Sequence, residues 1–141
     1  MSLFYWDTMM FIYWLEAHPS HAPQVEQIHR KMKARGDKLC TSVFTIGEIL
    51  TGACKSGRLT EAQQIKEFFR GGEVRVLQFG TDAAERYAFI QASHNLSQAD
   101  AIHLATASFA HVDVCLANDI KLRKLVVDGI QFFAGLDETI F

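Results

Sequence analysis

Two kinds of hydrophobic pattern alternate along the chain. Short continuous apolar runs such as Leu3–Trp6 are typical of strands that are buried on both faces of a sheet. Longer segments carry apolar residues three or four positions apart, as at Val25, Ile28 and Met32, which is the spacing of an amphipathic helix. The pattern therefore predicts strands that alternate with helices throughout the chain.

Cap and turn residues separate the predicted elements. Strands are expected over Leu3–Trp6, Leu39–Ser42, Glu73–Phe79, Val112–Leu116 and Ile130–Phe133. Helices are expected over Met9–Ala17, Ala22–Arg35, Val43–Lys55, Thr60–Arg70, Thr81–His94, Ser97–Ala110 and Ile120–Val127. This alternation predicts an α/β fold: a single three-layer α/β/α domain of residues 1–141, with a parallel sheet of four or five strands covered by helices on both faces.

Composition and charge narrow the class of protein. The chain has 141 residues, of which 49% are hydrophobic and 21% charged, so a disordered chain is excluded. The formal net charge of −2 excludes a globally basic nucleic-acid binder but leaves room for a local basic patch. The three cysteines are odd in number and have no C-x-x-C spacing, which argues against a disulfide framework or a zinc knuckle. The six histidines are scattered, and we expect structural or surface roles for them.

An apolar run near the N-terminus could be mistaken for a membrane span or a signal peptide. The segment from Leu3 to Leu15 is shorter than the roughly 20 residues that a membrane-spanning helix needs, and it contains Asp7. No Lys or Arg precedes Arg30, so the positively charged start of a signal peptide is missing. We therefore expect a cytoplasmic protein that does not associate with a membrane.

Four carboxylates lie where a parallel sheet would place its chemistry. Asp7 directly follows the first predicted strand and Asp119 follows the fourth, while Glu48 lies in the helix after the second strand. Asp100 begins the helix that leads into the fourth strand. Ligands of such folds bind beyond the carboxyl ends of the strands, so one edge could gather all four acids. Crowded carboxylates repel one another, and a hard cation such as Mg²⁺ or Mn²⁺ would relieve the repulsion. A cluster of this kind can activate water and stabilise an in-line displacement at phosphorus.

Each acid also has a structural alternative. Asp7 and Asp119 could simply cap the helices that follow them. Ser97-Gln98-Ala99-Asp100 fits the S-x-x-[DE] capping pattern. The apolar stripe predicted for the helix over residues 43–55 consists of Val43, Ile46, Leu50 and Cys54. Glu48 lies away from that stripe, so an ordinary solvated helix face would also explain it.

The segments around the four acids carry a family resemblance. They are Tyr5-Trp6-Asp7-Thr8, Thr45-Ile46-Gly47-Glu48-Ile49-Leu50, Leu96-Ser97-Gln98-Ala99-Asp100-Ala101-Ile102-His103-Leu104-Ala105-Thr106-Ala107 and Leu116-Ala117-Asn118-Asp119. In order and approximate spacing these segments resemble the PIN domain family, and specifically its small VapC-like ribonuclease toxins. The resemblance covers essentially the whole chain, and the segment around Asp100 is its most specific part.

The resemblance implies a metal-dependent endoribonuclease. In that family, metal-activated water attacks an RNA phosphodiester and leaves a 5′-phosphate and a 3′-hydroxyl. Carried over by motif, Asp7 and Asp100 would be the main metal ligands, and Glu48 and Asp119 would complete the acidic pocket directly or through water. Thr8 would orient the first ligand through its hydroxyl, and Asn118 would add a supporting hydrogen bond. The resemblance also implies a homodimer and a small antitoxin partner that blocks the pocket, which would make the chain the toxin of a type II toxin–antitoxin pair.

The fourth motif departs from the family pattern. Some members carry a further acid soon after the fourth one, whereas residues 120–124 here are basic or apolar. Ala117 also stands where Thr or Ser is common. Both departures weigh against a second metal site more than against the first. Lys121, Arg123 and Lys124 instead form a candidate phosphate-contacting patch for RNA, with a solvated helix face as the alternative.

Other readings of the same residues are weaker. A phosphorylation-dependent receiver module needs neighbouring acids after the first strand, but Trp6 and Thr8 flank Asp7. A haloacid-dehalogenase-type phosphatase needs a second Asp at the position of Met9, and no Gly-rich loop follows the first strand. Two alternatives stay open: a PIN nuclease that acts in RNA maturation or decay without being a toxin, and a non-catalytic PIN-like binding module.

Overall fold

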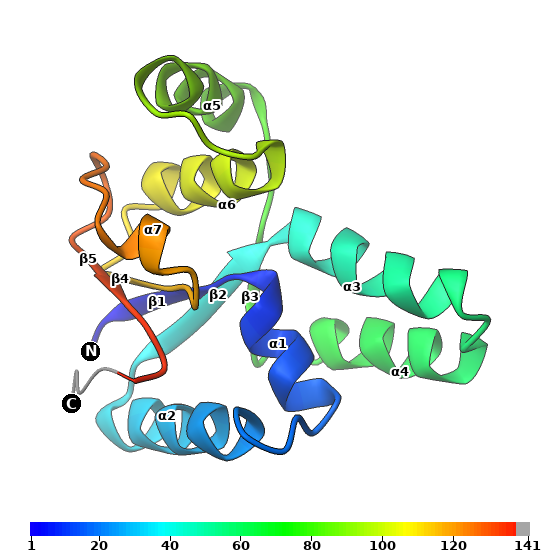
Figure 1. Cartoon of the computed structure of the whole chain (residues 1–141). Coiled ribbons are helices and arrows are strands. Elements are labelled where there is room, and N and C mark those ends of the chain that lie inside the picture. The colour runs from blue at the N-terminus through cyan, green and yellow to red at the C-terminus, as the bar shows by residue number, and fades with distance from the viewer. Residues whose placement is uncertain (138–141) are drawn as a thin grey trace.

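A five-stranded parallel sheet organises the chain, with helices on both of its faces (Figure 1). The computed structural model describes residues 1–137. The strands are β1 (Leu3–Trp6), β2 (Lys38–Ser42), β3 (Arg75–Leu77), β4 (Val114–Leu116) and β5 (Phe132–Ala134). The helices are α1 (Thr8–Leu15), α2 (Ala22–Arg35), α3 (Val43–Lys55), α4 (Leu59–Arg70), α5 (Thr81–Ser93), α6 (Gln98–Phe109) and α7 (Ile120–Arg123). The strand order is β3-β2-β1-β4-β5 and every neighbouring pair is parallel, so the predicted α/β fold is confirmed.

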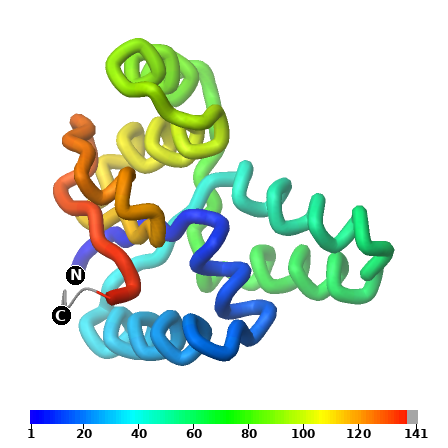
Figure 2. The backbone as a smooth tube through the Cα atoms, in the orientation of Figure 1, coloured from blue at the N-terminus to red at the C-terminus, as the bar shows by residue number. Residues whose placement is uncertain are grey.

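The central strand β1 contributes to two buried cores, because its side chains alternate between the faces of the sheet. Phe4 and Trp6 pack into the core that α1, α2, α3 and α4 cover. Tyr5 points to the opposite face and packs with residues of α5 and α6 such as Leu104. The backbone trace shows α5 and α6 on one side of the sheet and α2 on the other (Figure 2). The three layers of the prediction are therefore present.

The N-terminal apolar run is divided between two elements. Its first part forms β1, and its second part forms α1, in which Met10 and Phe11 are fully buried. Large apolar side chains in this run therefore serve the core that α1 shares with the sheet. None of the helices within residues 1–137 is long and apolar enough to cross a membrane.

The sheet reverses its direction of growth beside β1. From β1 the chain adds β2 and then β3 on one side, and afterwards it adds β4 and β5 on the other. Such a switch point leaves a crevice at the carboxyl ends of the two strands where the order reverses, here β1 and β4. The backbone N–H of Asp7 donates a hydrogen bond to the carbonyl oxygen of Leu116 at 3.3 Å, which joins these two strand ends. Asp7 therefore lies at the switch point.

Two elements are no more than half as long as their sequence patterns predict. The strand expected over Glu73–Phe79 is β3 alone, because β2 ends at Ser42, which pairs with Leu77 and then caps α3. The helix expected over Ile120–Val127 ends at Arg123. Val127 instead packs into the core beneath α5 and α6, so burial of its side chain competes successfully with continuation of the helix.

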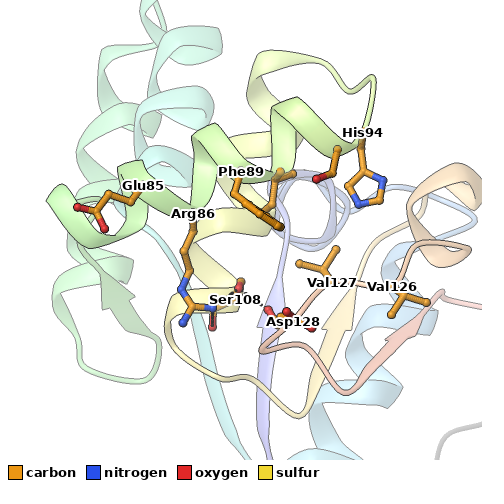
Figure 3. A pocket seen from close by; sticks show the side chains of 10 residues that line it. Glu85, Arg86, Phe89, His94, Ser108, Val126, Val127 and Asp128 are labelled. Carbon is orange, nitrogen blue, oxygen red and sulfur yellow. Dashed lines mark hydrogen bonds between the residues drawn. The ribbon is translucent and has the colours of Figure 1, made fainter.

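The segment that follows α7 packs tightly against the end of α6. Gly129 has a φ of 89°, and a Cβ atom at this position would overlap the carbonyl oxygen of Ser108. The Ser108 hydroxyl donates to the carbonyl oxygen of Asp128 and accepts a hydrogen bond from Arg86 Nη1 at 2.7 Å. Arg86, Phe89, Val126 and Asp128 help to line a pocket between α5 and this segment (Figure 3). The segment after α7 is thus held close to α6 in a non-helical conformation.

The buried stripe of α3 also differs from the predicted one. Its buried residues are Thr45, Ile49 and Ala53, whereas Val43 and Cys54 are exposed. Burial of a polar residue is possible here because the Thr45 hydroxyl lies 2.7 Å from the hydroxyl of Thr41 and shares a hydrogen bond with it. The predicted stripe is therefore wrong at Val43 and Cys54, while Ile46 packs against the core as predicted. Glu48, one turn after Thr45, borders the buried face of the helix.

Candidate functional site

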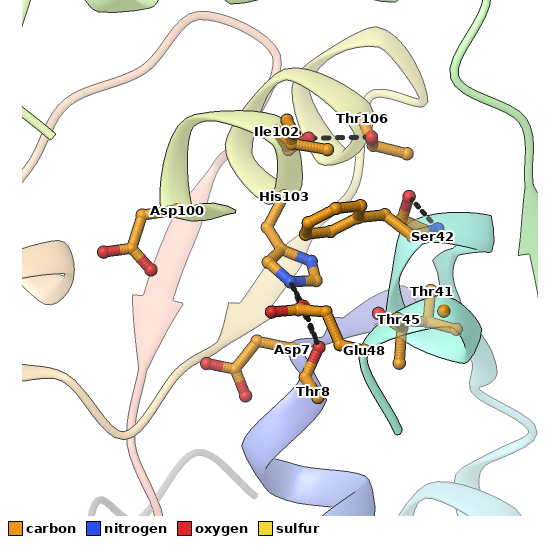
Figure 4. Close-up of polar contacts among 12 residues, drawn as sticks. Asp7, Thr8, Thr41, Ser42, Thr45, Glu48, Asp100, Ile102, His103 and Thr106 are labelled. Atoms are coloured by element: carbon orange, nitrogen blue, oxygen red, sulfur yellow. Dashed lines mark hydrogen bonds and ion pairs between the residues drawn. The ribbon is translucent and has the colours of Figure 1, made fainter. Parts of the chain in front are cut away.

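Three of the four predicted acids meet at the carboxyl edge of the sheet. Asp7 comes from the junction of β1 and α1, Glu48 from α3 and Asp100 from the first turn of α6. The charges of Asp100 and Glu48 both act on the carboxyl group of Asp7. Figure 4 shows the carboxylates of Asp7 and Asp100 on the same side of Glu48. Residues that are far apart in the sequence thus form one acidic group.

Asp7 has two roles in the structure. Its backbone is extended and its Oδ1 accepts a hydrogen bond from the N–H of Met10 at 3.3 Å, so it is the N-cap of α1, as the capping alternative predicted. Burial raises the pKa of Asp7 to about 6, and the charges of Asp100 and Glu48 add to this rise. The charge of His103 and the hydrogen bond from Met10 oppose it. An ionised Asp7 is therefore costly in the metal-free protein.

Glu48 is held by two side chains. Its Oε1 accepts a hydrogen bond from the Thr8 hydroxyl at 2.5 Å and lies 2.7 Å from His103 Nε2. Burial by itself would raise the pKa of Glu48, but the hydrogen bonds from His103 and Thr8 outweigh it and lower the pKa below its ordinary value. Glu48 is thus a fixed, ionised carboxylate, not a residue of a solvated helix face. Thr8, which was expected to orient Asp7, directs its hydroxyl to Glu48 instead.

Asp100 is positioned by the start of α6. The Ser97 hydroxyl accepts a hydrogen bond from the backbone N–H of Asp100 at 3.1 Å, which confirms Ser97 as the N-cap. Within residues 1–137, no hydrogen bond or ion pair engages the carboxylate of Asp100. One half of the capping pattern is therefore present, and the oxygens of Asp100 remain available on the side of the site where Asp7 lies (Figure 4).

The fourth acid is held differently. Asp119 is exposed and caps α7, because its Oδ1 accepts a hydrogen bond from the N–H of Lys121 at 2.9 Å. It is not among the described groups whose charges shift the pKa of Asp7. Asn118, which was expected to support the acids, donates a hydrogen bond from Nδ2 to the Tyr13 hydroxyl at 2.9 Å. Asp119 and Asn118 thus follow β4 beside the switch point but do not belong to the hydrogen-bonded group around Glu48.

The structure also separates the members of the candidate basic patch. Lys121 and Lys124 are exposed at α7. The side chain of Arg123 is only 13% exposed, and its Nη1 lies 2.8 Å from Asp137 Oδ1. Lys121 and Lys124 are therefore accessible to a polyanion, while the guanidinium of Arg123 is engaged within the protein.

Two residues of this site have no counterpart in the predicted set. His103 is buried and contacts both Glu48 and Thr8, and its Nδ1 lies 2.6 Å from the Tyr5 hydroxyl. A positional signal for both was available. His103 follows Asp100 by three residues and so shares its face of α6, and Tyr5 precedes Asp7 by two residues and so shares its face of β1.

The donor set fits a hard divalent cation that keeps water ligands. Mg²⁺ is commonly bound by only one or two carboxylates, and water completes its coordination. Asp7, Asp100 and Glu48 offer hard carboxylate oxygens, and a cation beside Asp7 would offset the repulsion that raises its pKa. No three His, Cys, Asp or Glu side chains in the described part of the chain are arranged to hold a metal by themselves. The geometry therefore suits a partly hydrated ion better than a cage built only from protein ligands.

Comparison with solved structures reveals the same fold in bacterial toxin–antitoxin complexes. The VapBC2 complex of Rickettsia felis, bound to a DNA fragment from its promoter, gives a TM-score of 0.74 at 14% identity, over 94% of this chain and 98% of that chain. The DNA-bound VapBC complex of Salmonella typhimurium gives 0.70 at 21% identity, over 96% and 99%. VapC20 of Mycobacterium tuberculosis, a sarcin–ricin-loop-cleaving toxin, gives 0.67 at 17% identity, over 87% and 96%. These three structures thus contain VapC toxins, at identities that establish the fold alone.

Comparison of the sequence with protein families gives the assignment. A search of the curated proteins found no match. The family scan, by contrast, matches residues 4–127 to the PIN domain. This range includes Asp7, Glu48, Asp100 and Asp119, and it extends over β1 to β4 of the sheet. Because the match takes in most of the chain and the fold agrees with it, the chain belongs to the PIN domain family.

Proposed function

We propose that the chain is a divalent-metal-dependent endoribonuclease. The observation that carries this proposal is the convergence of Asp7, Glu48 and Asp100 at the carboxyl end of the central strand, where two of the charges act on the buried carboxyl group of the third. Membership of the PIN domain family supports it, because PIN domains are typically nucleases and generally use divalent metals. We therefore propose Mg²⁺ or Mn²⁺ as the cofactor.

The proposed roles follow from how each side chain is held. Asp7 and Asp100 would hold the ion, and Glu48 would support it directly or through water from the position that Thr8 and His103 impose. Asp119 would complete the acidic pocket from the rim, because it is exposed and follows β4. A bound divalent cation supplies charge neutralisation at phosphate and activation of water. Asn118 would act indirectly, since its amide donates to Tyr13.

The proposed reaction is hydrolysis of an RNA phosphodiester. The oxygen of water bonds to phosphorus, the bond from phosphorus to the 3′-oxygen breaks, and the 3′-oxygen leaves with a proton. The products are a 5′-phosphate and a 3′-hydroxyl. Lys121 and Lys124, which are exposed at α7, would contact neighbouring phosphates of the substrate.

We further propose that the chain is the toxin of a type II toxin–antitoxin pair, with a small antitoxin protein as its partner and a homodimer as its assembly. The fold similarity to VapC toxins of VapBC complexes supports this proposal. Residues 1–141 would form one domain, since every described element packs around a single sheet. A small reading frame directly upstream, whose product binds the chain and abolishes its ribonuclease activity, is the expected partner. A monomer that no neighbouring product inhibits would contradict the toxin assignment while leaving the nuclease assignment open to its own test.

Metal binding tests the nuclease proposal most directly. The purified protein would be stripped with a chelator and titrated with Mn²⁺ by calorimetry, beside the folded variants Asp7→Asn and Asp100→Asn. We expect the wild-type protein to bind Mn²⁺ and both variants to lose binding, because each removes one anionic oxygen donor. Asp128→Asn is the matched control: this exposed aspartate lies near Ser108, at the opposite end of α6 from Asp100, and its replacement should leave binding unchanged.

RNA cleavage follows as the second step of the same test. We expect Mn²⁺-dependent cleavage that the two site variants lose and the control keeps. Folded wild-type protein that binds no Mn²⁺ at millimolar concentration, with or without RNA, would contradict the proposed function and favour a non-catalytic binding module.

A further inference from the structure

We propose that His103 is a positioning residue that orients the Glu48 carboxylate. The ring of His103 is held by its contact with the Tyr5 hydroxyl. One oxygen of Glu48 is then hydrogen-bonded, and the other faces the side of Asp7 and Asp100. The contribution of His103 to catalysis rests on the proposed nuclease function. The hydrogen-bonded chain from Tyr5 through His103 to Glu48 is present in the structure whatever the function of the site. His103 would touch neither RNA nor the reacting atoms and would act through Glu48.

The ring of His103 is held at both nitrogens and on its faces. Nε2 lies 2.7 Å from Glu48 Oε1, and Nδ1 lies 2.6 Å from the Tyr5 hydroxyl. The rings of Phe44 and Tyr5 pack against the imidazole with centroid distances of 5.5 and 5.9 Å. His103 is 6% exposed, so a rotated ring would lose both polar contacts inside the protein. The ring therefore has one well-defined orientation.

The chemistry of the partners assigns the protons. An ionised carboxylate only accepts hydrogen bonds, so Nε2 must carry the proton that bonds to Glu48. The Tyr5 hydroxyl keeps its own proton, because burial raises the pKa of Tyr5 well above its ordinary value. It can therefore donate to Nδ1, which accepts when the imidazole is neutral. The Glu48 carboxylate thus requires the proton on Nε2, and the Tyr5 hydroxyl supports the ring at Nδ1.

The two carboxylate oxygens of Glu48 have different surroundings. Oε1 accepts hydrogen bonds from both Thr8 and His103. Within residues 1–137 no hydrogen bond engages Oε2, and Figure 4 shows the carboxylate directed to the side where Asp7 and Asp100 lie. Partners that hold a ligand from behind in this way commonly set its orientation and its affinity for metal. Oε2 is then the oxygen that Glu48 contributes to the site.

The secondary structure couples the three acids through this chain. Tyr5 lies on β1 two residues before Asp7, which directly follows that strand, and Asp100 and His103 lie one turn apart on α6. The two elements that carry Asp7 and Asp100 therefore also carry the two residues that orient Glu48. A displacement of α6 relative to β1 would change the position of all three acids together.

The tautomer of His103 can be measured without metal or RNA. A long-range ¹H–¹⁵N spectrum of the metal-free, ¹⁵N-labelled wild-type protein at neutral pH reports which ring nitrogen is protonated, and loss of the signal in His103→Gln assigns it. We expect Nε2 to carry a proton in the wild-type protein, because Glu48 accepts a hydrogen bond from it. Tyr5→Phe, which removes only the hydroxyl, should keep that proton, because Glu48 remains in place. A wild-type protein with the proton on Nδ1 alone would overturn the proposal, because Nε2 could then not donate to Glu48.

The effect on the site can be measured by titration with Mn²⁺. We expect His103→Leu, which cannot donate to Glu48, to weaken Mn²⁺ binding about 10- to 100-fold. His103→Gln keeps an N–H donor near the position of Nε2 and should recover most of that loss. His29 provides the matched control, because it is also a buried histidine beside a carboxylate, with Nε2 3.0 Å from Glu73 Oε1, but it packs between α2 and the sheet. His29→Leu should leave Mn²⁺ affinity unchanged.

The outcomes separate this inference from the proposed function. Folded His103→Leu protein with the Mn²⁺ affinity of the wild-type protein would overturn the positioning role. Wild-type protein that binds no Mn²⁺ would overturn the nuclease proposal and the catalytic meaning of His103 with it. The tautomer spectrum would still decide whether His103 donates to Glu48.

Discussion

Glu48 and Asp119 are both acids from the predicted site, yet the protein holds them in opposite ways. Glu48 lies on the 13-residue helix α3, borders its buried face and accepts two side-chain hydrogen bonds. Asp119 caps the 4-residue helix α7, is exposed and bonds to the backbone of that same helix. The inner acids are therefore fixed relative to β1 and α6, whereas the outer acid depends on a short surface helix.

The contrast indicates different tasks for the two regions. A metal site requires ligands that the fold orients in advance, because the ion gains little from donors that must first be ordered. Asp7, Asp100 and Glu48 meet this requirement. The region around α7 offers exposed charge of both signs, Asp119 beside Lys121 and Lys124, which suits contact with a flexible polyanion. On the proposed function, the inner region would hold metal and the outer region would adjust to RNA.

Substitution of one acid in each region should produce the largest difference in RNA cleavage rate. We expect Asp100→Asn to lower the cleavage rate about 1,000-fold, because the loss of several kcal/mol of metal-dependent stabilisation corresponds to roughly a factor of ten for each 1.4 kcal/mol. Asp119→Asn should lower it about 10-fold, the lower end of the range for residues that support a site from outside. Initial rates on mixed ribosomal and transfer RNA, at a Mn²⁺ concentration that saturates the wild-type protein, measure both. Equal losses in the two variants would remove the distinction between the regions.

The second largest expected effect is an increase in the free energy of unfolding when Asp7 is replaced. The pKa of Asp7 is about 6 in the folded protein and about 4 in an unfolded chain, so the folded protein binds this proton more tightly. The stability of the metal-free protein should therefore fall as pH rises from about 4 to 6. Asp7→Asn removes this penalty and keeps an N-cap, so we expect its free energy of unfolding to increase by about 2–3 kcal/mol at pH 7.5.

Urea denaturation in the presence of a chelator measures this gain. At pH 4.5 the difference between Asp7→Asn and the wild-type protein should be markedly smaller, because most of the penalty develops at higher pH. Asp119→Asn is the control from the outer region and should change stability little, since Asp119 is exposed and Asn also caps helices. A gain for Asp7→Asn that is the same at both pH values would show that ionisation of Asp7 is not its cause.

The sequence contains enough local information to predict the order and type of every described element. Apolar runs, helical spacing and caps such as Asp7 and Ser97 act within a few residues, and the structure confirms them. The ends of β3 and α7 depend on distant partners. Leu77 ends β3 beside Ser42, where β2 ends, and the segment after α7 packs against the end of α6 through Gly129 and Ser108. Such boundaries require knowledge of the tertiary structure.

The candidate site also has one part that the sequence predicts and one part that depends on tertiary structure. The sequence predicts that its acids share one edge of the sheet, and Asp7, Glu48 and Asp100 do lie together. The orientation of α3 could not be inferred, because buried Thr45 is polar and exposed Val43 is apolar, which reverses the usual signal. The spacing of His103 from Asp100 places it near the site, but it does not identify Glu48 and Tyr5 as its partners. The role of His103 becomes visible only when three elements are placed together.

Phosphate contacts on α7 provide the smallest expected effect and the finest test of the outer region. Lys121 is exposed, so Lys121→Ala should weaken binding of a labelled single-stranded RNA a few-fold and reduce the slope of log affinity against log salt by about 0.7–1, the value for one lost phosphate contact. Fluorescence anisotropy between 50 and 200 mM salt, in an Asp100→Asn background that prevents cleavage, measures the slope. Arg123→Ala removes a neighbouring cation whose guanidinium is already paired with Asp137, so it should lower stability and leave the slope unchanged. A slope that changes with Arg123 and not with Lys121 would mean that RNA binding breaks the Arg123–Asp137 pair and reorganises the outer region.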